Sequence, residues 1–282
     1  MQIRNIDCSI ITDAVAGLCI KANYNLPMDI YSAIHKAGAT ESSPLGADIL
    51  KDIEENISIS RGCNLPICQD TGMAVVFLKI GQDVHFVNGD LYTAVNEGVK
   101  KGYNEGYLRK SVVCDPLNRI NTNDNTPAII HTEIVSGGEV EITVAPKGFG
   151  SENMSGIAML TPSAGRNGVI DAVVEIVKNA GSNPCPPMVI GVGIGGDFEK
   201  CAILSKRALC RSIEVRNPDP YYAALEEELL CKINGLSIGV QGFGGSTTAL
   251  GVNIEAYPTH IAGLPVAVNI GCHVTRHATV TL

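Results

Sequence analysis

Residues 188–210 read MVIGVGIGGDFEKCAILSKRALC, and this stretch carries the clearest indication of the fold. Met188 to Val192 is a short apolar run typical of a buried strand. Asp197 to Cys210 follows with the pattern of a helix, and the glycines between the two allow strand and helix to pack closely. A strand that leads directly into a helix predicts a mixed α/β fold.

The rest of the chain supports this class. The first sixty residues are typical of helices, including Met28–Lys36 and a second helix opened by Thr40-Glu41-Ser42-Ser43. Two hairpins are expected, one from Ala74–Ile80 and Val84–Val87, the other from Ala128–Val135 and Val140–Ala145. Further helices are expected at Leu91–Glu105, Val169–Ala180 and Tyr221–Gly235, and further strands at Gly251–Ile254 and Val266–Ile270. We therefore expect a single α/β mixed (α+β) domain over residues 1–282, with a helical amino-terminal part followed by mixed sheets with packed helices.

Composition excludes several functional classes. The 282 residues are 45% hydrophobic and 18% charged, enough to bury a large core. A net charge of −8, with 5% aromatic residues and no Trp, disfavours nucleic-acid binding. No apolar run reaches the roughly 18 residues of a membrane span, and Asp7 and Asp13 are unlike a signal peptide. We expect a cytoplasmic protein with no membrane or nucleic-acid partner.

A glycine motif offers one functional alternative. Gly191, Gly193 and Gly196 fit G-x-G-x-x-G, and Glu214 lies about where a ribose-binding acid is expected. A Rossmann-type dinucleotide-dependent oxidoreductase is therefore an alternative. Asp197, directly after the motif, would repel a pyrophosphate at the helix start, so the glycines are better explained by close packing of strand and helix.

The ten cysteines fall into two groups. Cys68, Cys185 and Cys272 stand beside Pro or Gly, which place side chains on turns. Cys201, Cys210 and Cys231 lie in helix-like stretches, where we expect buried core thiols.

Five separated blocks then carry a family resemblance: CQDTG (68–72), NTNDNTPAIIH (121–131), KGFGSEN (147–153), NPCPPMVIGVGIGG (183–196) and the tail NIGCHVTRHATV. In this order they resemble the iron–sulfur class I fumarate hydratases and the related L-tartrate dehydratases. The resemblance covers the chain from about residue 30 and corresponds to the α subunit. It implies a separate β subunit as partner, in a hetero-oligomer.

The resemblance further implies that Cys68, Cys185 and Cys272 bind a [4Fe–4S] cluster. Three thiolates on four irons leave one iron without a protein ligand, and that iron can act as a Lewis acid toward a small dicarboxylate. No redox change is required.

The resemblance also implies roles for other residues. It assigns Asp70 to proton delivery and Gln69 to substrate, although Asp70 in Asp-Thr-Gly is also typical of a plain Asx turn. Arg109 matches a carboxylate-binding arginine, and Lys147 and Gly148 open a loop able to face an anion; Phe149 stands where the family more often has Gly. His260 matches a histidine near the substrate, with a purely structural histidine as the alternative. Arg276 matches a basic residue that pairs with substrate or cluster.

The resemblance thus implies a hydro-lyase that interconverts fumarate and (S)-malate by reversible hydration, with the base for the C3 proton supplied by the β partner. L-Tartrate dehydratase is the alternative within the class. A Rossmann-type oxidoreductase and a non-catalytic interaction subunit are the alternatives outside it.

Overall fold

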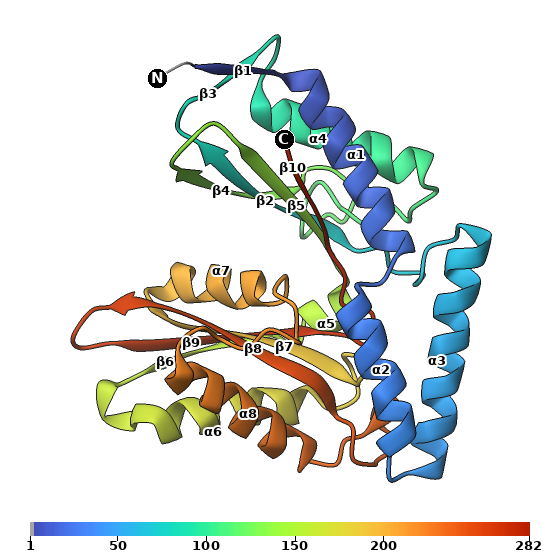
Figure 1. Ribbon diagram of the computed structural model, residues 1–282, viewed down its shortest axis with the longest axis vertical. Coiled ribbons are helices and arrows are strands. Elements are labelled where there is room, and N and C mark those ends of the chain that lie inside the picture. The colour runs from blue at the N-terminus through green and yellow to red at the C-terminus, as the bar shows by residue number, and fades with distance from the viewer. Residues whose placement is uncertain (1–2) are drawn as a thin grey trace. The chain divides into compact units, whose positions relative to one another are not determined.

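The computed structural model describes residues 3–282 (Figure 1). Contacts divide the chain into two compact units, each built from separate segments. Unit 1 comprises Ile59–Phe149, Arg276–Leu282 and the described part of Met1–Leu26, and unit 2 comprises Pro27–Ser58 and Gly150–Thr275. The expected single catalytic domain over 1–282 stays a prediction. Along residues 3–282 we find no helix with the length and apolar character needed to cross a bilayer.

Unit 1 contains a sheet with the strand order β10-β5-β2-β4. Strand β4 (Ile129–Val135) runs parallel to β2 (Met73–Gly81), β5 (Val140–Lys147) runs antiparallel to β2, and β10 (Ala278–Thr281) runs antiparallel to β5. Helices α1 (Cys8–Tyr24) and α4 (Leu91–Glu105) cover one face of this sheet (Figure 1). A short parallel pair is formed by β1 (Arg4–Asp7) and β3 (Val84–Val87).

The core of unit 1 follows from residue spacing. Ile11, Val15 and Leu18 are buried along one face of α1 at intervals of three and four. On β2, Val76 and Leu78 are buried at an interval of two and belong to the same apolar cluster. Periodicities of a helix and of a strand therefore meet in one core, as the sequence predicts for a mixed fold.

Both predicted hairpins are wrong, although their strands exist. Strand β3 pairs with β1 and not with β2, and β4 and β5 each pair with β2, which lies between them. The connection between β4 and β5 passes around the end of β2, where Gly81 N donates to Glu139 O at 2.8 Å and Gln82 N donates to Val135 O at 2.8 Å. A Cβ on Gly81 would lie 2.3 Å from Gly137 O, so this close crossing requires glycine.

Unit 2 has helices on both faces of a second sheet. The strands β6 (Gly156–Leu160), β9 (Leu264–Gly271), β7 (Met188–Gly196) and β8 (Ala249–Thr259) lie in that order. Helix α7 (Phe198–Ala208) lies on one face, and α6 (Gly165–Ala180) and α8 (Pro220–Asn234) lie on the other (Figure 1). The remaining helical segments are α2 (Met28–Thr40), α3 (Pro44–Cys63), α5 (Phe149–Glu152), η1 (Pro162–Ala164) and η2 (Val240–Gly242).

The glycine motif of β7 is a packing device. Ile190 and Val192 are fully buried in the core that includes α6 and α8. Gly191 and Gly193 alternate with them and face α7, where a Cβ on Gly193 would lie 2.0 Å from Cys201 O. Asp197 caps α7 by accepting a hydrogen bond from Lys200 N at 2.9 Å. Because the first two glycines lie inside the strand and Asp197 occupies the helix start, the packing interpretation is confirmed over dinucleotide binding.

Candidate active site

The strands of unit 1 bring four of the sequence motifs to one end of its sheet. Strands β2, β4 and β10 begin there, and β5 ends there, because β5 alone runs in the opposite direction. The motifs that flank these strand ends are CQDTG before β2, NTNDNTP before β4, KGFG at the end of β5 and Arg276 before β10. Chain positions more than 200 residues apart thus meet through sheet topology.

Asp70 joins two of these motifs. Its Oδ1 accepts from Gly72 N at 2.9 Å, and its Oδ2 accepts from Phe149 N at 3.0 Å. The Asx turn expected as the alternative is therefore present, and the same carboxylate also holds the glycine-rich loop. A Cβ on Gly148 would lie 3.0 Å from Oδ2, so a larger residue would crowd this contact.

Two buried residues that the sequence did not single out support the Asp70 turn. The hydroxyl of Tyr103 donates to Thr71 O at 2.7 Å and contacts Gly72 O at 3.0 Å. The Asn125 amide donates to Gly72 O at 3.2 Å, and its oxygen accepts from Ser111 N. Burial raises the pKa of Tyr103 far above its usual value, so this hydroxyl remains a donor. A lone Tyr inside a helix pattern gives no sequence sign of such a role.

The predicted basic residues of unit 1 have different environments. Arg276 is buried, and its guanidinium donates to Asp70 O at 2.6 Å and to Asn23 Oδ1 at 3.1 Å. Lys147 is also buried. Arg109 is exposed, and its carbonyl accepts from Thr71 Oγ1 at 3.0 Å, which places it beside the Asp70 turn. Gln69 is exposed on the same turn. Arg276 therefore holds the turn, while Arg109 and Gln69 are accessible to a ligand.

In unit 2, Cys185 and Cys272 lie at one end of the second sheet. Cys185 precedes β7 and Cys272 follows β9, and the pairing of Val189 with Gly271 makes these two strand ends adjacent. The carbonyl of Cys185 accepts from His273 N at 3.3 Å and lies 3.0 Å from His273 Nδ1. Cys185 has a φ of 57°, a left-handed conformation that is unusual outside glycine. Two of the three expected ligand turns are thus in direct contact.

The three expected ligands differ from the core cysteines. Cys185 is exposed and Cys68 and Cys272 are half-buried, whereas Cys19 and Cys201 are fully buried. Burial raises the pKa of Cys19 to about 12, as expected for a thiol in an apolar core. The core prediction is confirmed for Cys201, Cys210 is half-buried, and the prediction is wrong for Cys231, which is exposed on α8.

The donor set fits an iron–sulfur cluster, whose ligands are accessible thiolates on turns. Within residues 3–282, no group of three His, Cys, Asp or Glu side chains is arranged to hold a metal ion. Cys68 belongs to unit 1, whereas Cys185 and Cys272 belong to unit 2. Two observations therefore support the fit to a cluster: all three thiols are accessible on turns, and the Cys185 and Cys272 turns are in contact.

His260 lies at the opposite end of the sheet of unit 2. It follows β8 and precedes β9, so the full length of β9 separates it from Cys272. His260 Nδ1 accepts from Ala262 N at 3.1 Å, a contact that shapes the turn. The structure does not bring His260 to the ligand turns of its own unit. Its hydrogen bond with Ala262 N is the kind of contact expected of a purely structural histidine. A surface hollow of 620 Å³ beside His260 is lined mainly by α7 and the end of β8.

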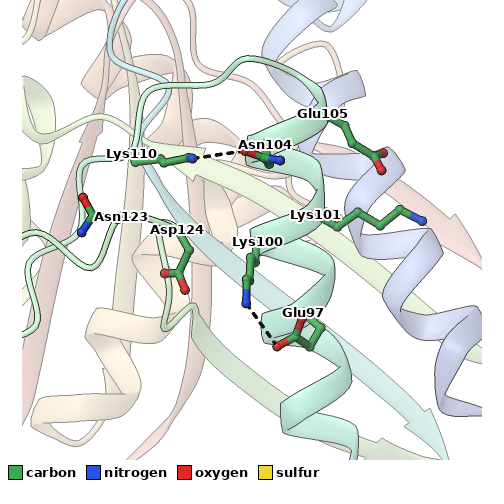
Figure 2. A pocket seen from close by; sticks show the side chains of 8 residues that line it. All are labelled: Glu97, Lys100, Lys101, Asn104, Glu105, Lys110, Asn123 and Asp124. Atoms are coloured by element: carbon green, nitrogen blue, oxygen red, sulfur yellow. Dashed lines mark hydrogen bonds and ion pairs between the residues drawn. The ribbon is translucent and has the colours of Figure 1, made fainter.

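A second hollow, of 370 Å³, lies in unit 1 between α4 and the loop at 110–124 (Figure 2). Lys100 and Lys110 enter it, but Lys110 donates to Asn104 at 3.2 Å and Lys100 lies 3.9 Å from Glu97. None of the predicted site residues lines it. Its positive and negative charges are balanced, so it offers no strong attraction for an anion.

Comparison with known proteins decides the family. A family model described as fumarate hydratase (Fumerase) matches residues 12–281. A chain of Methanocaldococcus jannaschii, provisionally named L(+)-tartrate dehydratase subunit alpha, is 44% identical over 274 residues, covering 95% of this chain and 96% of that one. The L(+)-tartrate dehydratase subunit alpha of Escherichia coli K12 is 32% identical over 273 residues, covering 95% and 89%.

This chain belongs to the fumarate hydratase (Fumerase) family. The resemblance found in the five sequence blocks is thereby confirmed, and the chain is an enzyme of the hydro-lyase class. Membership argues against both a Rossmann-type oxidoreductase and a non-catalytic interaction subunit.

Proposed function

We propose that this chain is the α subunit of a [4Fe–4S] hydro-lyase that interconverts fumarate and (S)-malate and acts with a separate β subunit. The observation that supports the proposal most directly is the contact between the Cys185 and Cys272 turns, from positions 87 residues apart. Relatives named as α subunits support the β partner. The cytoplasmic location stays a prediction.

In this proposal, Cys68, Cys185 and Cys272 hold the cluster. When bound, a [4Fe–4S] cluster with three protein thiolates supplies one iron as a Lewis acid for substrate oxygens. Cys68 stands two residues before Asp70 on the same turn, so a cluster bound there lies close to the Asp70 carboxylate.

Asp70 handles a proton in the proposed reaction. Dehydration of malate breaks the C2–O and C3–H bonds: a base takes the C3 proton, and an acid gives a different proton to the departing hydroxide, which leaves as water. Asp70 carries the proton that joins the departing hydroxyl, because the amides of Gly72 and Phe149 hold its carboxylate at the motif end of the sheet. The base that removes the C3 proton belongs to the β partner.

Substrate carboxylates need cationic and N–H groups. Arg109 is exposed beside the Asp70 turn and makes no side-chain ion pair within residues 3–282, so its guanidinium fork is available for bidentate binding. Gln69 and the main chain at Gly148 provide further polar contacts. Arg276 and Lys147, which are buried, support the turn and the loop.

L-Tartrate is the second candidate substrate, because the M. jannaschii and E. coli relatives carry the tartrate dehydratase name. L-Tartrate has a hydroxyl on the carbon that is CH₂ in malate. A site built for malate leaves that hydroxyl without a partner, which costs binding.

The test is an assay of the full chain with and without its β partner after anaerobic iron–sulfur reconstitution. We expect reversible fumarate hydration only with the partner present, and a higher kcat/KM for (S)-malate than for L-tartrate. A preference for L-tartrate would select the second candidate. Full turnover by the isolated chain would contradict the two-subunit proposal, and an iron-loaded complex inactive on both acids would contradict the function.

A further inference from the structure

The two ligand turns of unit 2 are joined by two side chains with no assigned role: His273, which lies in the tail block, and Gln241, which lies in none of the five blocks. His273 bonds the Cys185 carbonyl through its main-chain N–H at 3.3 Å and contacts it through Nδ1 at 3.0 Å. Because a carbonyl only accepts, His273 Nδ1 carries the hydrogen in this contact. His273 follows Cys272 directly, so it links one ligand turn to the other.

Gln241 makes a second link. Its main-chain N–H donates to Pro186 O at 2.8 Å, and its side-chain Nε2 donates to the same oxygen at 2.7 Å. Nε2 also lies 3.3 Å from His273 Nδ1, so the Gln241 amide packs against the imidazole. Gln241 has a φ of 51°, a strained conformation for a residue with a side chain. Strain of this kind persists only where surrounding contacts enforce it.

The loop that carries Gln241 is itself anchored. Glu41 Oε1 accepts from Ser246 N at 2.8 Å, and Oε2 accepts from Thr247 N at 2.8 Å. Glu41 thus anchors this loop at residues 246–247, and Gln241 anchors it at Pro186, both within unit 2.

We propose that Gln241 and His273 are positioning residues that bracket the Cys185 and Cys272 turns and hold their thiols as a pair. This inference deepens the proposed function and rests on it for the identity of the bound group. Since protein groups alone make the contact between the two turns, the pairing of their thiols can be tested without iron. Partners that orient metal ligands typically change metal affinity tenfold or more when removed.

The first experiment uses phenylarsine oxide on the iron-free full chain. Trivalent arsenic bonds two neighbouring thiols and releases its oxygen as water, with no oxidation. Cys63, Cys68, Cys114, Cys210 and Cys231 are replaced by Ser in this background, so that Cys185 and Cys272 remain as the accessible pair. We expect one equivalent to bind, and Cys272→Ser to abolish tight binding.

Two substitutions then test the positioning roles of Gln241 and His273. Gln241→Glu keeps the shape but places an oxygen against Pro186 O, and His273→Ala removes both the ring and its donor. Each should weaken arsenical binding by about tenfold, the cost of one or two lost hydrogen bonds. His273→Asn keeps a donor near the position of Nδ1 and should restore most of the affinity. Exposed His35→Ala is the matched control and should bind like the parent.

The second experiment measures iron in the chain with all its cysteines. Gln241→Glu and His273→Ala should reconstitute with less iron per chain and lose it in air several-fold faster than His35→Ala. Circular dichroism checks folding, and if either variant fails to fold, His273→Phe, which keeps a ring but removes the donor, and Gln241→Met carry the same comparison.

The two experiments separate the failure modes. Parent-like arsenical binding by both Gln241→Glu and His273→Ala overturns the positioning role, whatever the enzyme's activity. Weakened arsenical binding in a chain that never takes up iron leaves the thiol pair standing and instead contradicts the proposed function. Failure of the parent background to bind the arsenical at all also overturns the pairing.

Discussion

At the scale of single residues, Asp70 combines a structural and a chemical task. Asp70→Asn would place an NH₂ group against either Gly72 N or Phe149 N, both of which now donate to the carboxylate. We expect a loss of about 1–2 kcal/mol in unfolding free energy and a loss of at least about 100-fold in kcat. Urea unfolding and steady-state hydration kinetics measure the two effects.

Asp115→Asn is the matched control for Asp70. Asp115 closes a similar Asx turn by accepting from Leu117 N and Asn118 N, but it belongs to none of the four motifs. It should show a stability loss alone. Equal kinetic losses in the two variants would mean that Asp70 acts only as a turn residue.

Cysteine replacement tests the ligand assignment residue by residue. Cys68→Ser, Cys185→Ser and Cys272→Ser should each lower iron per chain strongly, because a hydroxyl is a poor ligand for iron–sulfur clusters. Cys231→Ser, on the exposed surface of α8, should retain the parent iron content. Iron and sulfide analysis after anaerobic reconstitution provides the measurement. Full iron retention in any of the first three would remove that residue from the ligand set.

At the scale of elements, the contact between β7 and α7 depends on glycine. An alanine at Gly193 would bring its Cβ within 2.0 Å of Cys201 O and 2.7 Å of Ser205 N, both in the backbone of α7. Gly193→Ala should therefore cost at least about 3 kcal/mol of unfolding free energy, since helix and strand must separate. Gly17→Ala, where nothing lies within 4 Å of the new Cβ, should instead stabilise α1 by about 0.5–1 kcal/mol. Denaturant unfolding of both variants checks this, and a neutral Gly193→Ala would refute the packing explanation.

The Glu41 anchor gives a prediction for pH. Although burial raises the pKa of Glu41, hydrogen bonds from Ser43, Thr247 and Ser246 outweigh it and lower the pKa to about 2. A carboxylate with a lowered pKa in the folded state stabilises the protein above the unfolded value near 4.5, and this stability is lost as pH falls toward 2.

Glu41→Gln should thus cost about 1–2 kcal/mol at pH 6, after allowance for solvent screening. The difference from the parent should shrink between pH 4.5 and 2. Exposed Glu55→Gln serves as the control and should follow the parent at every pH. The measurement is the unfolding free energy of the parent and both variants between pH 2 and 6. A difference between Glu41→Gln and the parent that stays constant with pH would show that the Glu41 charge is unimportant.

Element identity was more accessible from the sequence than element pairing. Leu91–Glu105 is helical with the predicted bounds, and the strands at Val84 and Val140 begin as predicted, because their spacing is local. The partners of β2 depend on a connection that closes around its end through Gly81, which no local pattern records. In the site, motif blocks were found by resemblance, whereas the roles of Tyr103, Gln241 and the motif residue Asn125 depend on main-chain oxygens that any sequence supplies.

At the scale of the whole molecule, the proposed ligands come from both units. Cys68 belongs to unit 1, and Cys185 and Cys272 belong to unit 2, while the chain passes between units within the KGFGSEN block and directly after Thr275. Under the proposal, a cluster that takes all three thiols would be held by residues of each unit. Binding to the folded state alone then stabilises both units together.

We expect cluster loading to raise the Tm of the chain, with each kcal/mol worth roughly 2–4 °C at this size. Hydrogen exchange should slow around residues 66–72 and 270–276 at the same time, because one group orders both segments. In Cys68→Ser that joint protection should be absent, whereas Cys231→Ser should keep it. Protection limited to 270–276 in the loaded parent would mean that the cluster is held by unit 2 without Cys68, and the three-ligand assignment would have to be abandoned.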